Sequence, residues 1–286
     1  MDVPILHSQL NGPIEDLGLL ERSLLFAELS NIVYLRDELV QPLAKTLTFD
    51  TCDFIEHDGS QAFIFEDETD CVVACRGTEP ADWNDIKADI DAVAVAAETI
   101  GRVHRGFKKE VDDLWPIIEG RLVANQKTLW FCGHSLGGAM AAICAGRCYL
   151  SHIESMPKGL FTYGSPRVGD NRYVNHVKLE YFRWVNNNDI VTHVPPAWMG
   201  YRHTGQEMYI NAYGRVREMT GWQRTKDRWR GFIHGIRNGK IDNFSDHLLD
   251  LYIEAVHEAL IKEQEGAMDR KSHTAVTKAA EAELVD

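Results

Sequence analysis

Residues 133–138 read Gly133-His134-Ser135-Leu136-Gly137-Gly138. They follow an apolar run, Thr128–Cys132, that is typical of a buried strand, and they precede an Ala-rich run, Leu136–Tyr149, that is typical of a helix. Glycine on both sides of Ser135 allows a strand to turn into a helix within a few residues. Such a turn strains the serine backbone and holds its hydroxyl clear of the sheet. The stretch therefore predicts a nucleophilic serine at the end of a strand, with the Leu136 amide at the helix N-terminus beside it.

The rest of the chain alternates between strand and helix patterns, which predicts an α/β fold with a mostly parallel sheet and helices on both faces. The predicted strands are Lys45–Phe49, Asp53–Glu56, Gln61–Glu66, Cys71–Cys75, Thr128–Cys132, Leu160–Tyr163 and Phe182–Val185. The predicted helices are Leu17–Leu39 with a break near Asn31, Lys108–Val123, Leu136–Tyr149 and Asp246–Ala259. We expect one domain over residues 1–263, followed by a polar C-terminal tail over residues 264–286.

The composition is that of an acidic globular protein. The chain has 286 residues, 44% of them hydrophobic, and its formal net charge of −13 argues against nucleic acid as a partner. The N-terminal residues show no basic region followed by a long apolar run. No secretion signal is therefore predicted, and a cytoplasmic location is expected, with secretion left open. No run is long and apolar enough to predict a membrane-spanning helix.

The cysteines are expected to be core thiols. Five of the six lie within apolar runs, where a free thiol behaves as a small hydrophobic group. Cys71 and Cys75 are four residues apart, as are Cys144 and Cys148, but no histidine or second cysteine pair completes a metal-ligand set. We expect neither a metal nor a cofactor.

Polar loops follow four of the predicted strands, at residues 76–78, 133–137, 164–169 and 186–189. In parallel sheets, ligands bind beyond the carboxyl ends of the strands, so these loops are expected to meet at one site.

The sequence of the turn and of these loops resembles the class 3 (fungal-type) lipase family of the α/β-hydrolase fold. The resemblance is carried by five stretches in family order, from about Val72 to Tyr252. They are Arg76-Gly77-Thr78, Val103-His104-Arg105-Gly106-Phe107, Gly133-His134-Ser135-Leu136-Gly137-Gly138-Ala139, Tyr163-Gly164-Ser165-Pro166-Arg167-Val168-Gly169, and Asn187-Asn188-Asp189-Ile190-Val191 leading to Val194-Pro195-Pro196. The resemblance implies a catalytic order of Ser, Asp and His, and an oxyanion hole that includes Thr78 with the Leu136 amide.

Twelve histidines compete for the role of general base. His247 fits the order that the resemblance implies, because it lies at the start of the predicted C-terminal helix. His193 and His203 are alternatives that follow the acid candidate closely. His134, inside the turn, is expected to point into the structure, and His104 resembles a structural element of the family.

For the acid, Asp189 lies beyond a predicted strand, where its carboxylate can orient an imidazole. Asp170 and Asp246 are the alternatives. Asp170 comes too early in the expected topology, and Asp246 is the direct neighbour of His247 on a helix.

Two segments bear on the substrate. Residues 79–100 resemble the lid-like segment of the family, with Trp83 and Ile86 as tentative lid or substrate-binding residues. Residues 79–89 of this segment carry four carboxylates, which is unlike a greasy lid and favours an esterase. Residues 218–240 are a basic, amphipathic, cap-like segment. Residues 222–240 of this segment are expected either to pack on the domain or to contact an anionic lipid surface.

These observations predict a serine carboxylic ester hydrolase of lipase type that acts on triacylglycerol or simpler esters through an acyl-enzyme. A phospholipase A-type or feruloyl-type esterase is an alternative within this class. Acyl transfer to an acceptor other than water would use the same residues. A non-catalytic lipid-binding protein on the same fold is the alternative from another class.

Overall fold

The computed structural model describes residues 3–77, 93–187, 189–216, 223 and 247–283. Its α-helices are α1 (Leu19–Ile32), α2 (Asp37–Thr46), α4 (Arg105–Leu122), α5 (Leu136–Arg147), α6 (Asn171–Val174) and α8 (Leu249–Glu283). Short 3₁₀ turns are η1 (Ile14–Asp16), η3 (Ile190–His193) and η4 (Ala197–Met199). The strands are β1 (Thr51–His57), β2 (Ser60–Glu66), β3 (Asp70–Cys75), β4 (Ala94–Ala96), β5 (Arg102–His104), β6 (Thr128–His134), β7 (Pro157–Tyr163), β8 (Gly169–Asp170), β9 (Glu180–Asn186), β10 (Tyr201–Arg202) and β11 (Gln206–Ile210).

A seven-stranded sheet forms the centre of the molecule, in the order β1-β2-β3-β6-β7-β9-β11. The strands from β3 to β11 run parallel, whereas β1 and β2 form an antiparallel hairpin at one edge. The register pairs Cys75 with Gly133 and His134 with Tyr163, so β3, β6 and β7 end side by side. The parallel sheet predicted from the alternating pattern is confirmed, and the loops after these strands meet at its carboxyl edge.

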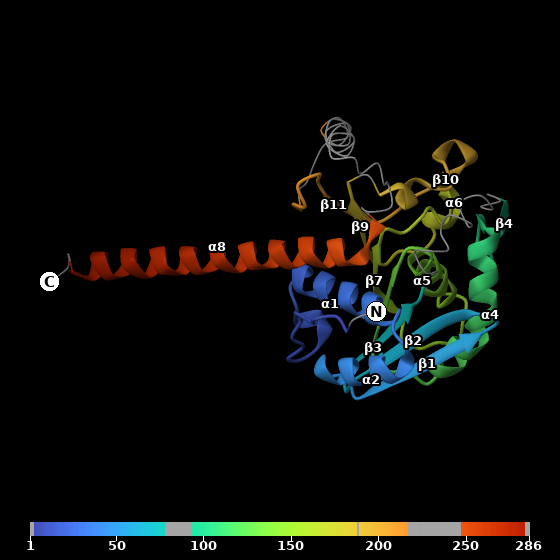
Figure 1. Ribbon diagram of the computed structural model, residues 1–286, viewed down its shortest axis with the longest axis horizontal. Helices are drawn as coiled ribbons and strands as arrows, with labels where there is room; N and C mark the ends of the chain where they lie inside the picture. Colours follow the sequence, from blue (N-terminus) through green and yellow to red (C-terminus); the bar gives the residue numbers. More distant parts are fainter. Residues whose placement is uncertain (1–2, 78–92, 188, 217–222, 224–246, 284–286) are drawn as a thin grey trace.

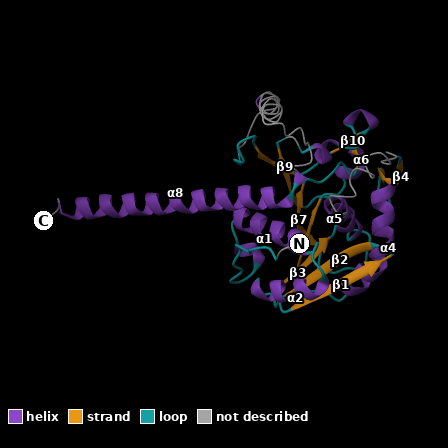
Figure 2. Ribbon diagram, in the orientation of Figure 1, coloured by secondary structure: helices purple, strands orange, loops and turns teal. Residues whose placement is uncertain are grey.

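Helices cover both faces of this sheet (Figures 1 and 2). Side chains alternate between the faces along β3: Val72 and Ala74 pack with α1, α2 and α8, whereas Val73 and Cys75 pack with α4 and α5. Because both faces are covered, β3 and the inner part of β6 consist almost entirely of apolar residues, as strands buried on two sides do. The core therefore lies in two layers, one on each side of the sheet.

The cysteines that were expected in the core are there. Five are buried free thiols, and Cys52 is partly buried. Burial raises the pKa of Cys132 to about 12, so this group stays a thiol near neutral pH.

The N-terminal region differs from the expectation in one element. The predicted strand Lys45–Phe49 is wrong: its first two residues form the last turn of α2, and Leu47 and Phe49 are buried in the turn that follows. The alternation of polar and apolar residues there arises because a loop carries Leu47 and Phe49 into the core. The predicted break near Asn31 is confirmed, because α1 ends at Ile32 and α2 begins at Asp37.

Two features of the sheets were not predicted. A small antiparallel sheet has the order β10-β8-β5-β4, with strands of two or three residues. The seventh strand of the main sheet, β11, pairs in parallel with β9. Both features build on the loops after β7 and β9 and tie those loops together.

The last helix is longer than predicted. α8 continues to Glu283, past the predicted end at Ala259 and into residues expected to form a polar tail, and Figure 1 shows it extending away from the rest of the molecule. Its buried side chains lie in the first turns, and none from Ile261 to Met268 is buried. Helix propensity accounts for the extension, because the sequence beyond Ala259 is rich in Ala, Glu and Lys and contains no proline. Within the described residues, no helix has the length and apolar character to cross a bilayer.

Candidate active site

Ser135 lies on the turn between β6 and α5, at φ +59° and ψ −130°. This is a strained conformation for a residue with a side chain. The turn is possible because its glycines allow close backbone contact. A Cβ at Gly137 would lie 2.2 Å from the carbonyl oxygen of Cys75, and one at Gly133 would lie 2.4 Å from the Gly137 backbone. The Ser135 amide donates to the carbonyl of Tyr163 at 2.9 Å, which fixes the turn against β7.

His247 lies between Ser135 and Asp189 in a chain of hydrogen bonds. Its Nε2 is 2.8 Å from Ser135 Oγ, and its Nδ1 is 2.9 Å from Asp189 Oδ2. All three side chains are buried. A carboxylate can only accept, so Nδ1 carries the proton and Nε2 is free to accept from the serine hydroxyl. The residues predicted as nucleophile, base and acid are thus brought together in the order that acyl transfer requires.

The carboxylate of Asp189 is fully hydrogen-bonded on both oxygens. Oδ1 accepts from the Val191 amide at 2.9 Å, which caps η3 just after β9. Oδ2 accepts from His247 and also from the hydroxyl of Tyr252 on α8, at 2.5 Å. The buried carboxylate thus has a hydrogen-bond donor on each of its oxygens.

Tyr252 lies within the predicted helix Asp246–Ala259, and no role in the site was predicted for it. Its phenol also accepts from the Asn186 amide at 3.1 Å. The hydroxyl of a buried tyrosine needs a hydrogen-bond partner, and this requirement was the signal in the sequence for a polar role of Tyr252.

His134 is hydrogen-bonded to His247, the predicted base. Its Nε2–H donates to the carbonyl oxygen of His247 at 2.8 Å, and the two rings lie 4.5 Å apart. Its Nδ1 then accepts from the hydroxyl of Tyr34 at 3.2 Å. Burial, together with the neighbouring His247, holds the pKa of His134 well below its usual range, so the ring is neutral as this pattern of bonds requires. The expectation that His134 points into the structure agrees with these bonds, whereas the role of Tyr34 carried no signal in the sequence.

The alternative bases lie elsewhere. His193 Nδ1 contacts the backbone carbonyl of Asp189 at 3.0 Å, and His203 Nε2 donates to the carbonyl of Thr192 at 2.7 Å, so neither ring takes the place of His247 between nucleophile and carboxylate. His104 caps the start of α4.

Of the alternative acids, Asp170 caps α6 through the amides of Arg172 and Tyr173. Asp246 lies outside the described residues.

The oxyanion site is described in part. Leu136 is the first residue of α5. The first amides of a helix have no partner within the helix and form the positive end of the helix dipole. Gly77 lies against the same turn, since a Cβ there would be 2.8 Å from the carbonyl oxygen of His134 and 3.0 Å from the amide nitrogen of Gly137. Thr78, the predicted second donor, lies outside the described residues, as do the lid candidates Trp83 and Ile86 and the basic segment 222–240 apart from Gln223.

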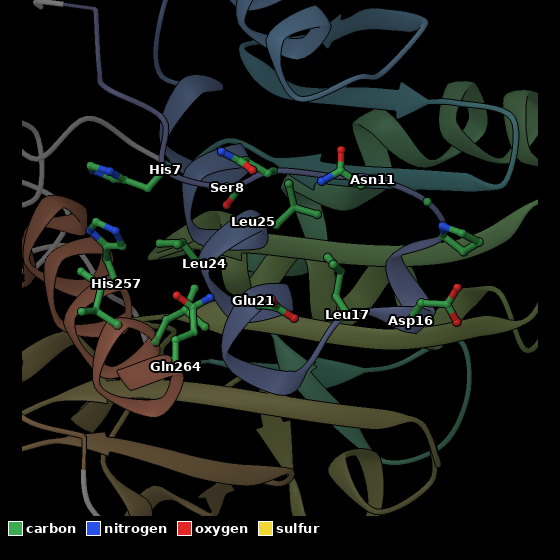
Figure 3. Close-up of a pocket in the computed structure, with 15 residues that line it drawn as sticks. His7, Ser8, Asn11, Asp16, Leu17, Glu21, Leu24, Leu25, His257 and Gln264 are labelled. Carbon is green, nitrogen blue, oxygen red and sulfur yellow. The ribbon is translucent and has the colours of Figure 1, made fainter. Parts of the chain in front are cut away.

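A cavity of about 490 Å³ lies away from this site, between the N-terminal segment, α1 and α8 (Figure 3). Leu17, Leu24 and Leu25 line it on one side, and His7 and His257 stack at one end with their ring centroids 4.0 Å apart. None of Ser135, Asp189 and His247 lines it. Within the described residues, no group of three or more His, Cys, Asp or Glu side chains is placed to hold a metal ion.

Comparison with known proteins agrees with this geometry. The family model for lipase (class 3) matches residues 72–199, which include β3, the nucleophile turn and Asp189. A lipase from Rhizomucor miehei is 32% identical over 182 residues, which cover 58% of this chain and 46% of that protein. Over residues 72–199 the chain is similar to the class 3 lipase family. Because β3, β6, β7 and β9 with their loops make up the matched region, the family match falls on the carboxyl edge of the sheet.

Two further relatives extend the comparison. A secreted mono- and diacylglycerol lipase from Fusarium solani is 36% identical over 117 residues, or 38% of this chain and 34% of that protein. The solved structure of a triacylglycerol lipase, described as having a serine protease triad at its catalytic centre, superposes with a TM-score of 0.55 at 25% identity over 67% of this chain and 80% of that one. The chain therefore has the α/β-hydrolase fold of class 3 lipases. Its alignments span less than half the length of the two curated relatives.

Proposed function

We propose that this protein is a serine carboxylic ester hydrolase of lipase type. The observation that carries the proposal is the continuous chain of hydrogen bonds from Ser135 Oγ through His247 to Asp189, at 2.8 and 2.9 Å. A serine hydroxyl is a poor nucleophile until a base removes its proton, and this arrangement supplies that base in the correct tautomer.

The reaction has two halves. In the first, Ser135 Oγ attacks the ester carbonyl carbon while its proton passes to His247 Nε2, and the alcohol leaves after taking that proton. In the second, a water molecule gives a proton to Nε2 and attacks the acyl-enzyme, which releases the carboxylic acid and restores Ser135. Asp189 keeps Nδ1 protonated and stabilises the imidazolium that forms in both halves.

The negative charge that develops on the carbonyl oxygen needs donors that are already in place. The Leu136 amide at the start of α5 is one candidate, and we propose Thr78 as the other.

We propose a lipid ester as substrate, because the relatives described above are named as lipases, including one for mono- and diacylglycerol. The same residues would serve a phospholipase A, a feruloyl-type esterase or an acyltransferase. These alternatives differ in the acyl or alcohol part of the substrate, so they are separated by a substrate panel.

The proposal is tested with Ser135→Ala. This variant should lower kcat by about 10⁴- to 10⁶-fold, since nothing else in the site can form the acyl-enzyme. Ser151→Ala, at the opposite end of α5, removes a hydroxyl that only bonds the carbonyl of Arg147 and should keep full activity. Rates are compared on nitrophenyl esters of increasing chain length, emulsified triacylglycerol, phospholipid and a feruloyl ester, each with and without an added alcohol acceptor.

An alkyl phosphonate that traps serine nucleophiles gives an independent readout. It should add once to the native chain, at Ser135, and not to Ser135→Ala. Folded protein that neither reacts with the phosphonate nor hydrolyses any ester of the panel would overturn the proposal in favour of a non-catalytic lipid-binding protein.

A further inference from the structure

Trp198 is the most exposed large apolar side chain among the described residues, at 84% of its full accessible surface. It lies at the centre of η4, in a turn over residues 196–200 that we call the Trp198 turn. The next residue, Met199, is 41% exposed. A single exposed apolar side chain is common on folded proteins, so exposure alone decides nothing. Three further features of the turn indicate what it binds.

The first feature is rigidity. The Met199 amide donates to the Pro196 carbonyl at 3.0 Å, and the Gly200 amide donates to the Ala197 carbonyl at 3.1 Å. The guanidinium of Arg202 donates to the same Ala197 carbonyl at 2.5 Å. The backbone of the turn is thus held in shape while its largest side chain is exposed to solvent, so little backbone entropy remains to be lost when that side chain is buried against a partner.

The second feature is position. Arg167 holds the chain just before the turn, through its amide to the Val194 carbonyl at 2.8 Å and its guanidinium to the Pro195 carbonyl at 3.0 Å. Arg167 belongs to the loop that begins at Gly164, and a Cβ at Gly164 would lie within 2.8 Å of both Asp189 and His247. The loop that begins at Gly164 therefore lies against Asp189 and His247 at its start and, through Arg167, bonds the residues just before the Trp198 turn.

The third feature is charge. The chain carries a net charge of −13, yet residues 190–206 contain no Asp or Glu. Arg202, at the end of the turn, is exposed. An exposed indole beside an exposed cation, with no carboxylate in the same segment, is the combination that proteins place at the boundary between lipid and water.

We infer that the Trp198 turn is a fixed anchor for a lipid surface, which inserts Trp198 into the lipid–water boundary. The choice of a lipid as partner rests on the proposed function. The anchor differs from the lid-like segment 79–100 and from the basic segment 222–240, because the Trp198 turn follows residues that Arg167, on the loop after β7, holds through the Pro195 carbonyl.

Binding is measured with vesicles of phosphatidylcholine containing phosphatidylglycerol, in a Ser135→Ala background so that the lipid stays intact. Trp198→Ala should weaken sedimentation with the vesicles by about tenfold, the loss expected when one large apolar side chain no longer leaves water. Trp198→Phe should keep most of the binding. Leu150→Ala is the matched control, because Leu150 is 54% exposed but follows α5 at the opposite edge of the sheet.

Kinetics with active enzyme complete the test. Trp198→Ala should lower the rate on a dilute triacylglycerol emulsion by about tenfold and leave the rate on a dissolved short-chain nitrophenyl ester unchanged. Equal vesicle binding by Trp198→Ala and the parent protein would overturn the inference. So would a change in oligomeric state on light scattering without a change in vesicle binding, because the turn would then contact a second copy of the chain.

The two proposals fail in different ways. Vesicle binding that depends on Trp198 in a protein that hydrolyses no ester would refute the proposed function and leave the anchor standing. Hydrolysis of emulsions at a rate that does not depend on Trp198 would refute the anchor and leave the proposed function standing.

Discussion

Gly164 shows how closely the backbone is packed around the acid and the base. It follows β7 at φ +60°, and a Cβ there would lie 2.7 Å from Asp189 Oδ2 and 2.8 Å from Nδ1 of His247. Real Cβ atoms do not approach so closely, so the absence of a side chain at Gly164 is a condition for the bond between Asp189 and His247.

Gly164→Ala should therefore damage catalysis more than folding. The added methyl group displaces His247 or Asp189, and a misplacement of about 1 Å costs on the order of 10²-fold in kcat. The backbone penalty of a side chain at positive φ is about 1–2 kcal/mol. Gly59→Ala is the control, because Gly59 also has positive φ, at +85°, but has open space around it. Both variants should lose similar stability in urea, and only Gly164→Ala should lose activity; equal kcat values would show that the site adapts to the methyl group.

At the residue level, the sequence was informative where chemistry and chain order restrict the choice. Ser135 could be predicted because only a Gly-flanked serine fits a strained turn after a buried strand. Asp189 was predicted from its place after a strand, and His247 from the order Ser, Asp and His that the family resemblance implies, together with its place at the start of a helix. Tyr34 and Tyr252 could not be found in this way, because their roles depend on contacts across 100 and 63 residues of sequence.

Among the elements, the long parallel strands were predictable because burial on both faces makes them continuously apolar. The small sheet of β4, β5, β8 and β10 was not, since two or three residues are too few to show a period. The end of α8 was also missed, because helix propensity continues where the apolar face stops. α8 combines two parts: an inner part that bears Tyr252 and packs in the core, and an outer part without buried side chains from Ile261 to Met268.

This division within α8 predicts the effect of truncation. A chain that ends at Met268 should keep its kcat on a dissolved ester and a Tm within about 2 °C, because the buried residues of the helix lie before Ile261. A chain that ends at Leu251 loses the Tyr252 hydroxyl on Asp189 and the apolar contacts of Ile253 and Val256, and should lose activity. Calorimetry and a nitrophenyl ester assay measure both. A large loss of activity in the longer chain would mean that the outer part of α8 contributes to the site.

At the scale of the whole molecule, two neutral histidines, the buried His134 and the partly buried His203, make the free energy of unfolding depend on pH. Burial holds the pKa of His134 well below its usual range, and His247 adds to this. Burial also lowers the pKa of His203, with the nearby charge of Arg183 as the next cause. Both rings donate to backbone carbonyls, of His247 and of Thr192 respectively, so they join β6 to the start of α8 and η3 to the segment before β11.

In the folded protein these two histidines therefore stay neutral at pH values below about 6.5, where the same residues of the unfolded chain become protonated. In that range the unfolded state binds more protons, so stability decreases as the pH falls, by up to about 1.4 kcal/mol per pH unit for each histidine. Urea unfolding between pH 8 and pH 5 should show a plateau above about pH 7 and a slope of up to about 2.7 kcal/mol per unit below it. His203→Gln keeps a donor for the Thr192 carbonyl but cannot be protonated, and should reduce the slope by about half. A free energy of unfolding that stays level from pH 8 to pH 5 would contradict the neutral state of His134, and with it the hydrogen bond that holds the backbone of His247.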